Sequence, residues 1–417
     1  MNYRLGVLGY MADAALSAQA SNRVSGNYGF QDQLFALKWV QQNIGAFGGN
    51  PHEVTIFGES AGAFSVCAAV VSPAGAGLFQ HAISQSGPCA FLLPTQAGAE
   101  ALGTTIVSAL GCGDATDALT VACLRSLSVG AILTVENNVF SAPGFSSIFD
   151  FFPNVDGVLI PQQPALALAL GKYNHVPVIQ GTNHGEGRYF VAVAFDLNPA
   201  VGALKPADYP TAVEALAATF VTQESGIFPT TATSTASLVQ QIAQEILNEY
   251  PLSNFANPDE ALSAAFTDGA FSCQANIANE ILSLSVPTFG YEFNDENAPM
   301  LFLPPVSFPY GATHTDELQF LFPFEPALLS ASEQQLATRM KSYWTNFARN
   351  GNPNRSGTAP WAAFNLLAGN VQSLIPPTPQ IEFDFAKEHN CGFWIGILEQ
   401  TILQSVANTL TAHAIVH

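Results

Sequence analysis

The sequence predicts an α/β fold in which a mostly parallel sheet is flanked by helices. Short apolar strands alternate with long helical stretches along the chain, and one strand passes through a glycine-flanked turn directly into a helix. Strands separated by helices need crossover connections, which give parallel pairing. No composition break divides the 417 residues. A chain of this length can bury one large core, so we expect a single domain over residues 1–417.

The first two elements are predicted near the N-terminus. The opening residues MNYRLGVLGY have the pattern of a strand, without a charged and then apolar leader. Residues 32–47 are predicted to form a helix that Asp32 caps and Gly48 stops. Its apolar residues recur on one face: Leu34, Leu37, Val40 and Ile44.

Four further strands and two further helices are predicted downstream. The strands are short apolar or β-branched runs at residues 54–57, 82–85, 176–181 and 287–293. The helices are expected at residues 61–71 and 332–350. The second helix has an apolar side formed by Leu336, Met340, Tyr343, Trp344 and Phe347.

The stretch VTIFGESAGAFSV, residues 54–66, places a serine between two glycines where a predicted strand turns into a helix. Such a turn needs small residues around the serine, and Gly58, Ala61 and Gly62 provide them. The helix would direct its first N–H groups and its positive dipole end at the same spot, which favours an oxyanion there. A Gly-x-Ser-x-Gly match alone also occurs by chance. The strand, turn and helix around it make Ser60 a candidate nucleophile.

A serine nucleophile needs a base, and the base needs an orienting acid. After such a turn the expected chain order is serine, then Asp or Glu, then histidine, each following a strand. Glu186 follows the strand at 176–181 and His314 follows the strand at 287–293. Taken alone, Glu186 is read as a solvated carboxylate and His314 as an ordinary surface or core histidine. The other histidines fit the order less well, since they precede the acid or lie in the tail: His52, His81, His175, His184, His389, His413 and His417.

Charge and cysteine usage exclude several classes of function. The 32 acidic and 12 basic residues give a formal net charge of −20, which repels nucleic acids and anionic lipid surfaces. No apolar run has membrane-spanning length, because polar residues interrupt the stretch 395–416. No two of the six cysteines form a Cys-x-x-Cys site, so we expect no metal. Cys112 and Cys123 bracket a polar segment, as either a disulfide loop or two small buried hydrophobes.

The segment FGESAGAFSV resembles the nucleophile turn of the type-B carboxylesterase/lipase family, which includes the cholinesterases and secreted fungal lipases. Other segments resemble the family too and follow its order: NYRLGVLGY, DQLFALKWVQQNIGAFGGNPHEVTIFGESAG, HAISQSG, PNVDG, VPVIQGTNHGEG, YGATHTDELQFLF, YWTNFARNGNPN and CGFW. Together they cover nearly the whole chain. The resemblance implies an α/β-hydrolase fold.

The resemblance also implies roles for individual residues. Ser60 would be the nucleophile, Glu186 the triad acid and His314 the base. The N–H of Ala61 would be one oxyanion donor, and Glu59 and Glu317 would make supporting hydrogen bonds beside the triad. The resemblance further implies a Cys112–Cys123 disulfide and thus an oxidising, extracellular location. Asn354 begins an Asn-Arg-Ser sequon, which is either a glycosylation site or a chance tripeptide.

Two departures from the family pattern are visible. The family usually has Asp-Glu-Gly at the acid, where this chain has Gly185-Glu186-Gly187. The family's leading strands, first disulfide loop and Gly-Gly oxyanion loop would all precede residue 1. We therefore expect the chain to be N-terminally incomplete, to lack its remaining oxyanion donors and to have weak activity by itself.

The expected reaction is two-step acyl transfer from a carboxylic ester through an acyl-enzyme, without a cofactor. Two alternatives stay open: a non-catalytic cholinesterase-like binding or adhesion domain, which usually loses a triad residue, and a peptidase with the same turn. A phenylalanine cluster would either line an acyl pocket or belong to the core: Phe140, Phe145, Phe149, Phe151 and Phe152.

Overall fold

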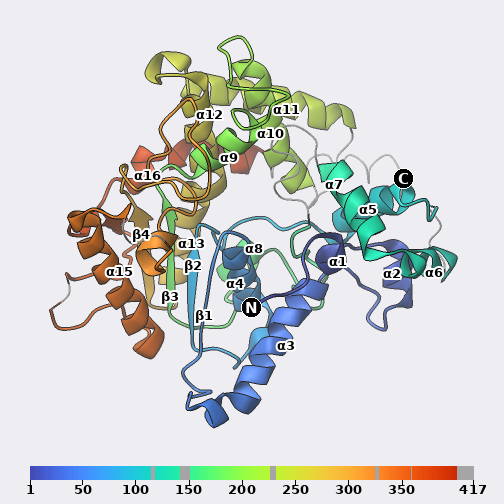
Figure 1. Cartoon of the computed structure of the whole chain (residues 1–417), viewed down its shortest axis with the longest axis horizontal. Coiled ribbons are helices and arrows are strands. Elements are labelled where there is room, and N and C mark those ends of the chain that lie inside the picture. Colours follow the sequence, from blue (N-terminus) through green and yellow to red (C-terminus); the bar gives the residue numbers. More distant parts are fainter. Residues whose placement is uncertain (114–117, 141–150, 226–231, 325–327, 358, 402–417) are drawn as a thin grey trace.

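The chain folds around one six-stranded sheet (Figure 1). A computed structural model describes residues 1–113, 118–140, 151–225, 232–324, 328–357 and 359–401. The strands lie in sequence order: β1 Thr55–Glu59, β2 His81–Gln85, β3 Val178–Asn183, β4 Thr288–Phe293, β5 Val371–Leu374 and β6 Gln380–Glu382. The first five strands run parallel, and β6 runs antiparallel to β5. The prediction of a mostly parallel sheet is confirmed.

Helices connect the strands and flank the sheet (Figure 1). In the first half of the chain they are α1 Gly6–Tyr10, α2 Ala14–Gln19, α3 Tyr28–Asn43, α4 Ala61–Val71, α5 Gln96–Ala109, α6 Ala118–Ser126, α7 Val129–Phe140, α8 Pro164–Ala169 and α9 Glu186–Ala194. In the second half they are α10 Tyr209–Ser225, α11 Ala232–Glu249, α12 Pro258–Thr267, α13 Cys273–Ser283, α14 Leu318–Leu321, α15 Ala331–Asn350 and α16 Phe385–Glu388.

Alternate residues of each strand point to opposite faces of the sheet, and this alternation separates two layers of core. Ala82 and Val178 pack with side chains of α3, α4 and α13 on one face. Their neighbours Ile83 and Ile179 pack against α15 on the other face. The α15 residues in that layer are the five predicted for its apolar side: Leu336, Met340, Tyr343, Trp344 and Phe347.

A third layer lies beyond the carboxyl ends of the strands. Its buried residues come from α9, α10, α11 and α12, and Figure 1 shows these helices gathered above β3 and β4. Trp394 and Ile397, from the C-terminal segment, pack into the same cluster. This layer covers the edge of the sheet at which the candidate acid and base lie.

Helix α3 begins one turn earlier than the predicted residue 32, and Asp32 does not cap it. The Asp32 carboxylate forms an ion pair with Arg4 at 2.7 Å instead. The predicted stop is confirmed, because a short 3-10 turn continues the helix to Phe47 and Gly48 then takes a φ of 81°. Such positive φ values favour glycine.

The prediction of a strand over the first ten residues is wrong, because residues 6–10 form helix α1. Val7 and Tyr10 are both buried. Residues three positions apart face opposite sides of a strand but the same side of a helix, so burying both requires the helical turn. Gly6, with a φ of 54°, lets the chain enter that turn.

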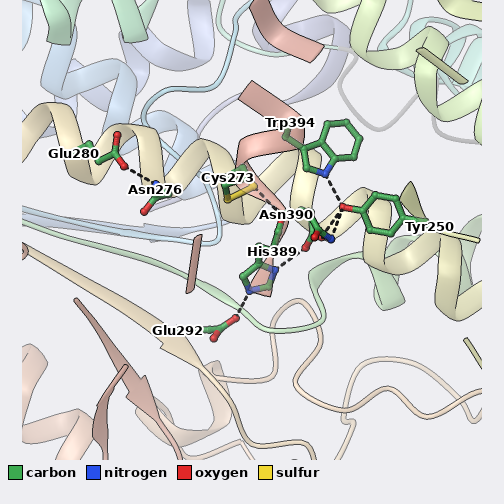
Figure 2. Close-up of a disulfide and its surroundings, with 10 residues drawn as sticks. Tyr250, Cys273, Asn276, Glu280, Glu292, His389, Asn390 and Trp394 are labelled. Carbon is green, nitrogen blue, oxygen red and sulfur yellow. Dashed lines mark hydrogen bonds and ion pairs between the residues drawn. A yellow bond between two sulfur atoms is a disulfide. The ribbon is translucent and has the colours of Figure 1, made fainter. Parts of the chain in front are cut away.

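All six cysteines are in disulfide bonds: Cys67–Cys89, Cys112–Cys123 and Cys273–Cys391. The middle bond is the one implied by the family resemblance. The first ties α4 to the segment after β2, and the third ties α13 to the C-terminal segment (Figure 2). Sequence reasoning missed these two because their partners are 22 and 118 residues apart.

The described part of the chain contains no single helix that is long and apolar enough to span a membrane. One sharply bent pair, Ala118–Ser126 with Val129–Asn138, meets the length and composition criteria when the two helices are taken together.

Candidate active site

Ser60 lies at the turn from β1 into α4, at the carboxyl edge of the sheet. Its backbone has a φ of 55° and a ψ of −120°, a strained conformation for a residue other than glycine. The turn is held by its own backbone, since the Ser60 N–H donates to the carbonyl of Gln85 at 2.9 Å. The Ser60 carbonyl accepts from the N–H groups of Ala63 and Phe64 at 2.9 and 3.0 Å. The predicted strand, sharp turn and helix are therefore confirmed.

Only one of the two glycines that flank Ser60 is required by close packing. A Cβ atom at Gly58 would lie 2.4 Å from the Gly62 carbonyl carbon and oxygen. A Cβ atom at Gly62 would meet nothing within 4 Å. A third glycine, Gly87, is also required, because its Cβ atom would lie 2.5 Å from the Cβ atom of Ala63. Close packing therefore does not require glycine at position 62.

The structure brings Ser60, His314 and Glu186 together although they are far apart in sequence. The Ser60 hydroxyl lies 2.8 Å from Nε2 of His314. The other ring nitrogen, Nδ1, lies 2.6 Å from Oε2 of Glu186. Glu186 Oε1 accepts a hydrogen bond from the Asn183 N–H at 2.8 Å. Both oxygens of this buried carboxylate are therefore engaged, and the imidazole is held with Nε2 toward the serine.

Carboxylates dominate the electrostatics around His314. Burial by itself lowers the pKa of His314, but the neighbouring carboxylates of Glu59 and Glu186 outweigh it and raise that pKa to about 9. Glu59 Oε1 lies 3.2 Å from His314 Nε2, on the same side as the serine. Burial raises the pKa of Glu59 to about 8 against the attraction of His314. A proton on Glu59 would therefore leave the imidazole with less negative charge nearby.

Glu317 joins the ends of two strands beside Ser60, His314 and Glu186. Its Oε1 accepts from Gln85 Nε2 at 2.9 Å, and its Oε2 accepts from Asn183 Nδ2 at 2.8 Å. Asn183 Nδ2 also donates to the carbonyl of Thr313, the residue before His314, at 2.6 Å. Burial raises the pKa of Glu317. Of the supporting hydrogen bonds expected for the two residues, those of Glu317 are present. Glu59 Oε1 lies close to His314 Nε2 but has no hydrogen-bond partner.

Sequence reasoning missed Gln85 and Asn183, which link Glu317 to β2 and β3. Neither residue belongs to a recognisable catalytic motif. The available signal was their position, since each is the last residue of a predicted or observed parallel strand whose carboxyl end faces the site. Trp344 of α15 donates its Nε1–H to Gln85 Oε1 at 2.9 Å. The core layer beneath α15 is thereby connected to the hydrogen bonds that hold Glu317.

Three aromatic rings surround His314. The rings of Tyr189, Phe190 and Phe271 have centroids 5.7, 4.8 and 5.4 Å from that of the imidazole. Tyr189 and Phe190 belong to α9, which begins at Glu186, so one helix supplies both the Glu186 carboxylate and two of the rings around His314. These rings shield the hydrogen bond between His314 and Glu186 from water, which strengthens it.

Ala61 and Asn354 are two further residues singled out from the sequence. Ala61 is the exposed first residue of α4, and the N–H at this helix position has no intrahelical partner. Asn354 Nδ2, where a glycan would attach, instead donates to Asn352 Oδ1 at 3.0 Å and to the Trp361 carbonyl at 2.8 Å.

Phe152, from the predicted phenylalanine cluster, packs against core rings. Its ring centroid lies 5.1 Å from that of Phe64 and 6.0 Å from that of Phe91, and Phe151 is partly buried in the same layer. Phe145, Phe149 and the side chain of Phe140 lie outside the described residues. The core alternative therefore holds for Phe152.

Comparisons with known proteins agree with this geometry. A model of the carboxylesterase family matches residues 1–394. Cocaine esterase of Homo sapiens is 32% identical over 412 residues, which make up 96% of this chain and 66% of that protein. The medium-chain fatty acyl-CoA hydrolase precursor of Anas platyrhynchos is also 32% identical, over 96% of this chain and 67% of its own length. Among solved structures, a PNB esterase matches with a TM-score of 0.72 and 27% identity, over 94% of this chain and 73% of its own. This chain spans about two thirds of the length of these two curated relatives.

Proposed function

Because this chain belongs to the carboxylesterase family, we propose that it hydrolyses carboxylic esters through Ser60, His314 and Glu186. The observation that carries the proposal is the continuous contact from the Ser60 hydroxyl to His314 at 2.8 Å and from His314 to Glu186 at 2.6 Å. A hydroxyl, an imidazole and a buried carboxylate in this order make up the machinery of serine hydrolysis. The names of the relatives refer to different substrates, so the proposal specifies the ester bond and not the acyl or alcohol group.

The reaction has two steps of acyl transfer. His314 takes the Ser60 proton through Nε2 as the hydroxyl oxygen attacks the ester carbonyl carbon. Glu186 accepts the Nδ1–H, which fixes the tautomer, and its charge stabilises the imidazolium that forms. His314 then protonates the departing alcohol and leaves an acyl group on Ser60. Water, activated by the same imidazole, releases the acid and restores the serine.

The negative charge on the carbonyl oxygen needs donors in the transition state. The N–H of Ala61 follows the nucleophile at the first position of α4, where it has no intrahelical acceptor. The dipole of α4 adds positive potential at the same end. We assign Ala61 as one oxyanion donor.

We also place the enzyme in an oxidising compartment outside the cytosol. Three disulfides involve every cysteine of the chain, and disulfides persist where thiols are not kept reduced. This agrees with the extracellular location implied by the sequence resemblance. The hydrogen bonds of Asn354 disfavour a glycan on the folded protein at the one sequon that the sequence analysis singled out.

Covalent labelling tests the proposed function. A fluorophosphonate probe should modify the wild-type protein at Ser60 and stop its hydrolysis of a short-chain p-nitrophenyl ester. Ser60→Ala should abolish the label, whereas Ser65→Ala, which removes another serine of the same segment, should keep it. If the folded wild-type protein takes no label, the non-catalytic binding domain becomes the better reading. Labelling of Ser60→Ala at the wild-type level would place the nucleophile elsewhere.

A further inference from the structure

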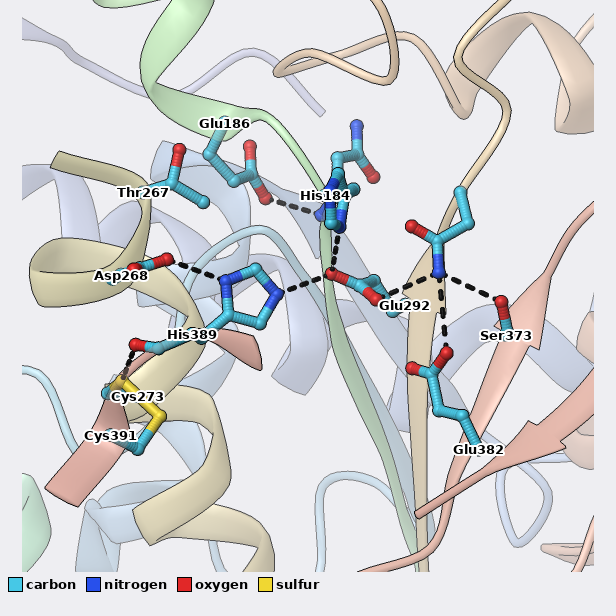
Figure 3. A network of polar contacts seen from close by, with 12 residues as sticks. His184, Glu186, Thr267, Asp268, Cys273, Glu292, Ser373, Glu382, His389 and Cys391 are labelled. Carbon is cyan, nitrogen blue, oxygen red and sulfur yellow. Dashed lines mark hydrogen bonds and ion pairs between the residues drawn. A yellow bond between two sulfur atoms is a disulfide. The ribbon is translucent and has the colours of Figure 1, made fainter. Parts of the chain in front are cut away.

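His184, Glu292 and His389 form a second cluster of titratable side chains that the proposed mechanism does not use (Figure 3). One nitrogen or oxygen atom from each residue lies within 4.8 Å of the others. His184 directly follows β3, Glu292 lies in the adjacent strand β4, and His389 directly follows α16. The sheet therefore places the first two side by side, and the C-terminal segment adds the third. We call these three residues the histidine cluster.

Both histidines of the cluster are directed at the same atom. His389 Nε2 lies 2.6 Å from Oε1 of Glu292, and His184 Nδ1 lies 3.0 Å from that oxygen. Two imidazole nitrogens and one carboxylate oxygen thus converge on one small volume. These donor types, in this number, suit a zinc ion.

The other nitrogen of His389 is held in the way that metal ligands usually are. Its Nδ1 lies 2.6 Å from Oδ1 of Asp268, and Asp268 Oδ2 accepts from the Tyr250 hydroxyl at 2.6 Å. Trp394 Nε1 donates to the same hydroxyl oxygen at 2.8 Å (Figure 2). Histidine ligands commonly donate their second N–H to a carboxylate, which fixes the ring and its tautomer. Nε2 of His389 is therefore aimed into the cluster by contacts outside it.

Glu292 is oriented by a separate set of contacts. Asn294 Nδ2 donates to Glu292 Oε2 at 2.8 Å and to Ser373 Oγ at 2.8 Å. The amide occupies Oε2, so Oε1 is the oxygen that faces the two histidines (Figure 3). Glu292 is fully buried, whereas the His184 side chain is 28% exposed.

A cavity of about 250 Å³ reaches the two histidines of the cluster. Its lining includes both histidines together with Thr267, Asp268 and Glu388. An ion and water molecules have room to enter from this side. A water molecule from the cavity can then supply the fourth ligand of a tetrahedral site.

We propose that His184 Nδ1, His389 Nε2 and Glu292 Oε1 bind Zn²⁺. Each imidazole must release to solvent the proton that it shares with the Glu292 carboxylate, because zinc binds neutral histidine. Tetrahedral zinc, with ligands at about 2.0–2.1 Å, separates ligand atoms by roughly 3.3 Å. The contacts to Glu292 at 2.6 and 3.0 Å therefore have to open slightly, and the partly exposed His184 can move to allow this.

This proposal departs from the sequence-based expectation of no metal, which considered close cysteine spacings. The cluster residues are separated by 108 and 97 positions, so no local spacing reveals them. Zinc at this point would tie together three segments: the β3 end that leads to Glu186, β4, and the C-terminal segment held by Cys391. We therefore assign the ion a role in stability rather than in the acyl-transfer chemistry.

Zinc content and cobalt spectroscopy test the proposal on the full chain. After removal of metal with a chelator and dialysis against Zn²⁺, the wild-type protein should bind one zinc ion per chain and unfold at a higher temperature than the metal-free protein. Co²⁺ in place of zinc should give the visible absorption of a tetrahedral complex. His184→Gln, at a partly exposed side chain, should lose most of the bound metal and the thermal shift. His52→Gln, at an exposed histidine outside the cluster, should keep both.

Two results would overturn the zinc site. One is a wild-type protein that binds no zinc and unfolds at the same temperature with Zn²⁺ and with chelator. This result is expected if the histidines are protonated and form ion pairs with the carboxylates instead of binding a metal. The other is zinc binding that survives in the double variant His184→Gln and Glu292→Gln, shown by circular dichroism to be folded.

Discussion

Glu59 acts on the proposed base more directly than the other carboxylates outside the triad. Its Oε1 lies 3.2 Å from His314 Nε2, the atom that must accept the Ser60 proton. An ionised Glu59 stabilises the imidazolium, and an imidazolium cannot act as a base. Burial raises the pKa of Glu59 to about 8, so the negative charge that Glu59 places beside His314 is greatest at alkaline pH.

Glu59→Gln is expected to move the acid limb of the kcat/KM profile to lower pH. The substitution removes a carboxylate that raises the pKa of His314, so this pKa falls. Activity appears as the pH rises through the pKa of the base, and a lower pKa brings the limb down by roughly 1–3 units. Hydrolysis of a p-nitrophenyl ester across pH measures the shift.

The exposed Glu53→Gln is the matched control and should leave the profile in place. An unchanged acid limb in an active Glu59→Gln variant would show that Glu59 does not set the pKa of the base.

The sequence could identify residues that lie in a local motif or follow predicted strands in an expected order. Ser60 has a glycine-flanked turn, and Glu186 and His314 follow strands in the expected order. Gln85 and Asn183 hold Glu317 in place but are ordinary amides in sequence. Their role depends on which strands become neighbours, and this is set by the sheet rather than by any local pattern.

At the scale of elements, the turn between β1 and α4 is the most constrained connection near the site. Gly58 and Gly62 of this turn can each be changed to alanine, and the space around the added methyl group differs between them. Gly58 lies against the backbone of Gly62, whereas the Cβ direction of Gly62 is open. A comparison of the two alanine variants therefore separates the effect of close packing on the free energy of unfolding from the effect of backbone freedom.

Gly58→Ala is expected to lower the free energy of unfolding by about 3 kcal/mol or more, because the new Cβ atom overlaps backbone atoms that cannot move independently. Gly62→Ala should leave it unchanged or raise it by up to about 1 kcal/mol, because alanine favours a helix over glycine. Urea unfolding of both variants gives the two values. Equal losses would mean that the turn is limited by something other than the approach of Gly58 to Gly62.

Elements with strong local signals were predicted well. The strands at residues 54–57, 82–85, 176–181 and 287–293 correspond to β1 to β4, and the helix at 332–350 corresponds to α15 with a boundary shift of one residue. That helix has a capping box of Ser330 and Glu333 and ends at Gly351, which takes a φ of 70°. The prediction for the first ten residues failed because a five-residue helix has too few turns to show the 3.6-residue period of its apolar side chains.

At the scale of the whole molecule, long-range connections escape sequence reasoning. The bond between Cys273 and Cys391 and the histidine cluster both attach the C-terminal segment to the body of the fold. Their members lie about 100 residues apart, at positions that only the final topology brings together. The fold class could be predicted because the alternation of strands and helices is a local pattern that repeats along the chain. Each of these long-range contacts occurs once and leaves no local pattern.

Buried carboxyls make the stability of the whole molecule depend on pH. Burial raises the pKa of Asp316 to about 9 and the pKa values of Asp259 and Asp295 to about 6. In the unfolded chain these groups have a pKa of about 3.9. A folded pKa above the unfolded value means that the folded state keeps protons that the unfolded state releases. The stability contributed is fully present below the unfolded pKa and is lost as the pH rises through the folded pKa.

The free energy of unfolding is therefore expected to fall as the pH rises from about 5.5 to about 8.5. Relief of repulsion at acid pH, in a chain with a net charge of −20, would give a slope of the same sign. Salt separates the two causes, because at about 1 M it screens exposed charges beyond about 3 Å and acts much less on buried groups. Urea unfolding at both pH values should thus show that most of the change in free energy with pH remains at high salt. Asp316→Asn, which cannot ionise, should reduce this change.

A change that vanishes at high salt would assign the effect to surface repulsion. A change that is the same in Asp316→Asn would show that this buried carboxyl is not one of its sources.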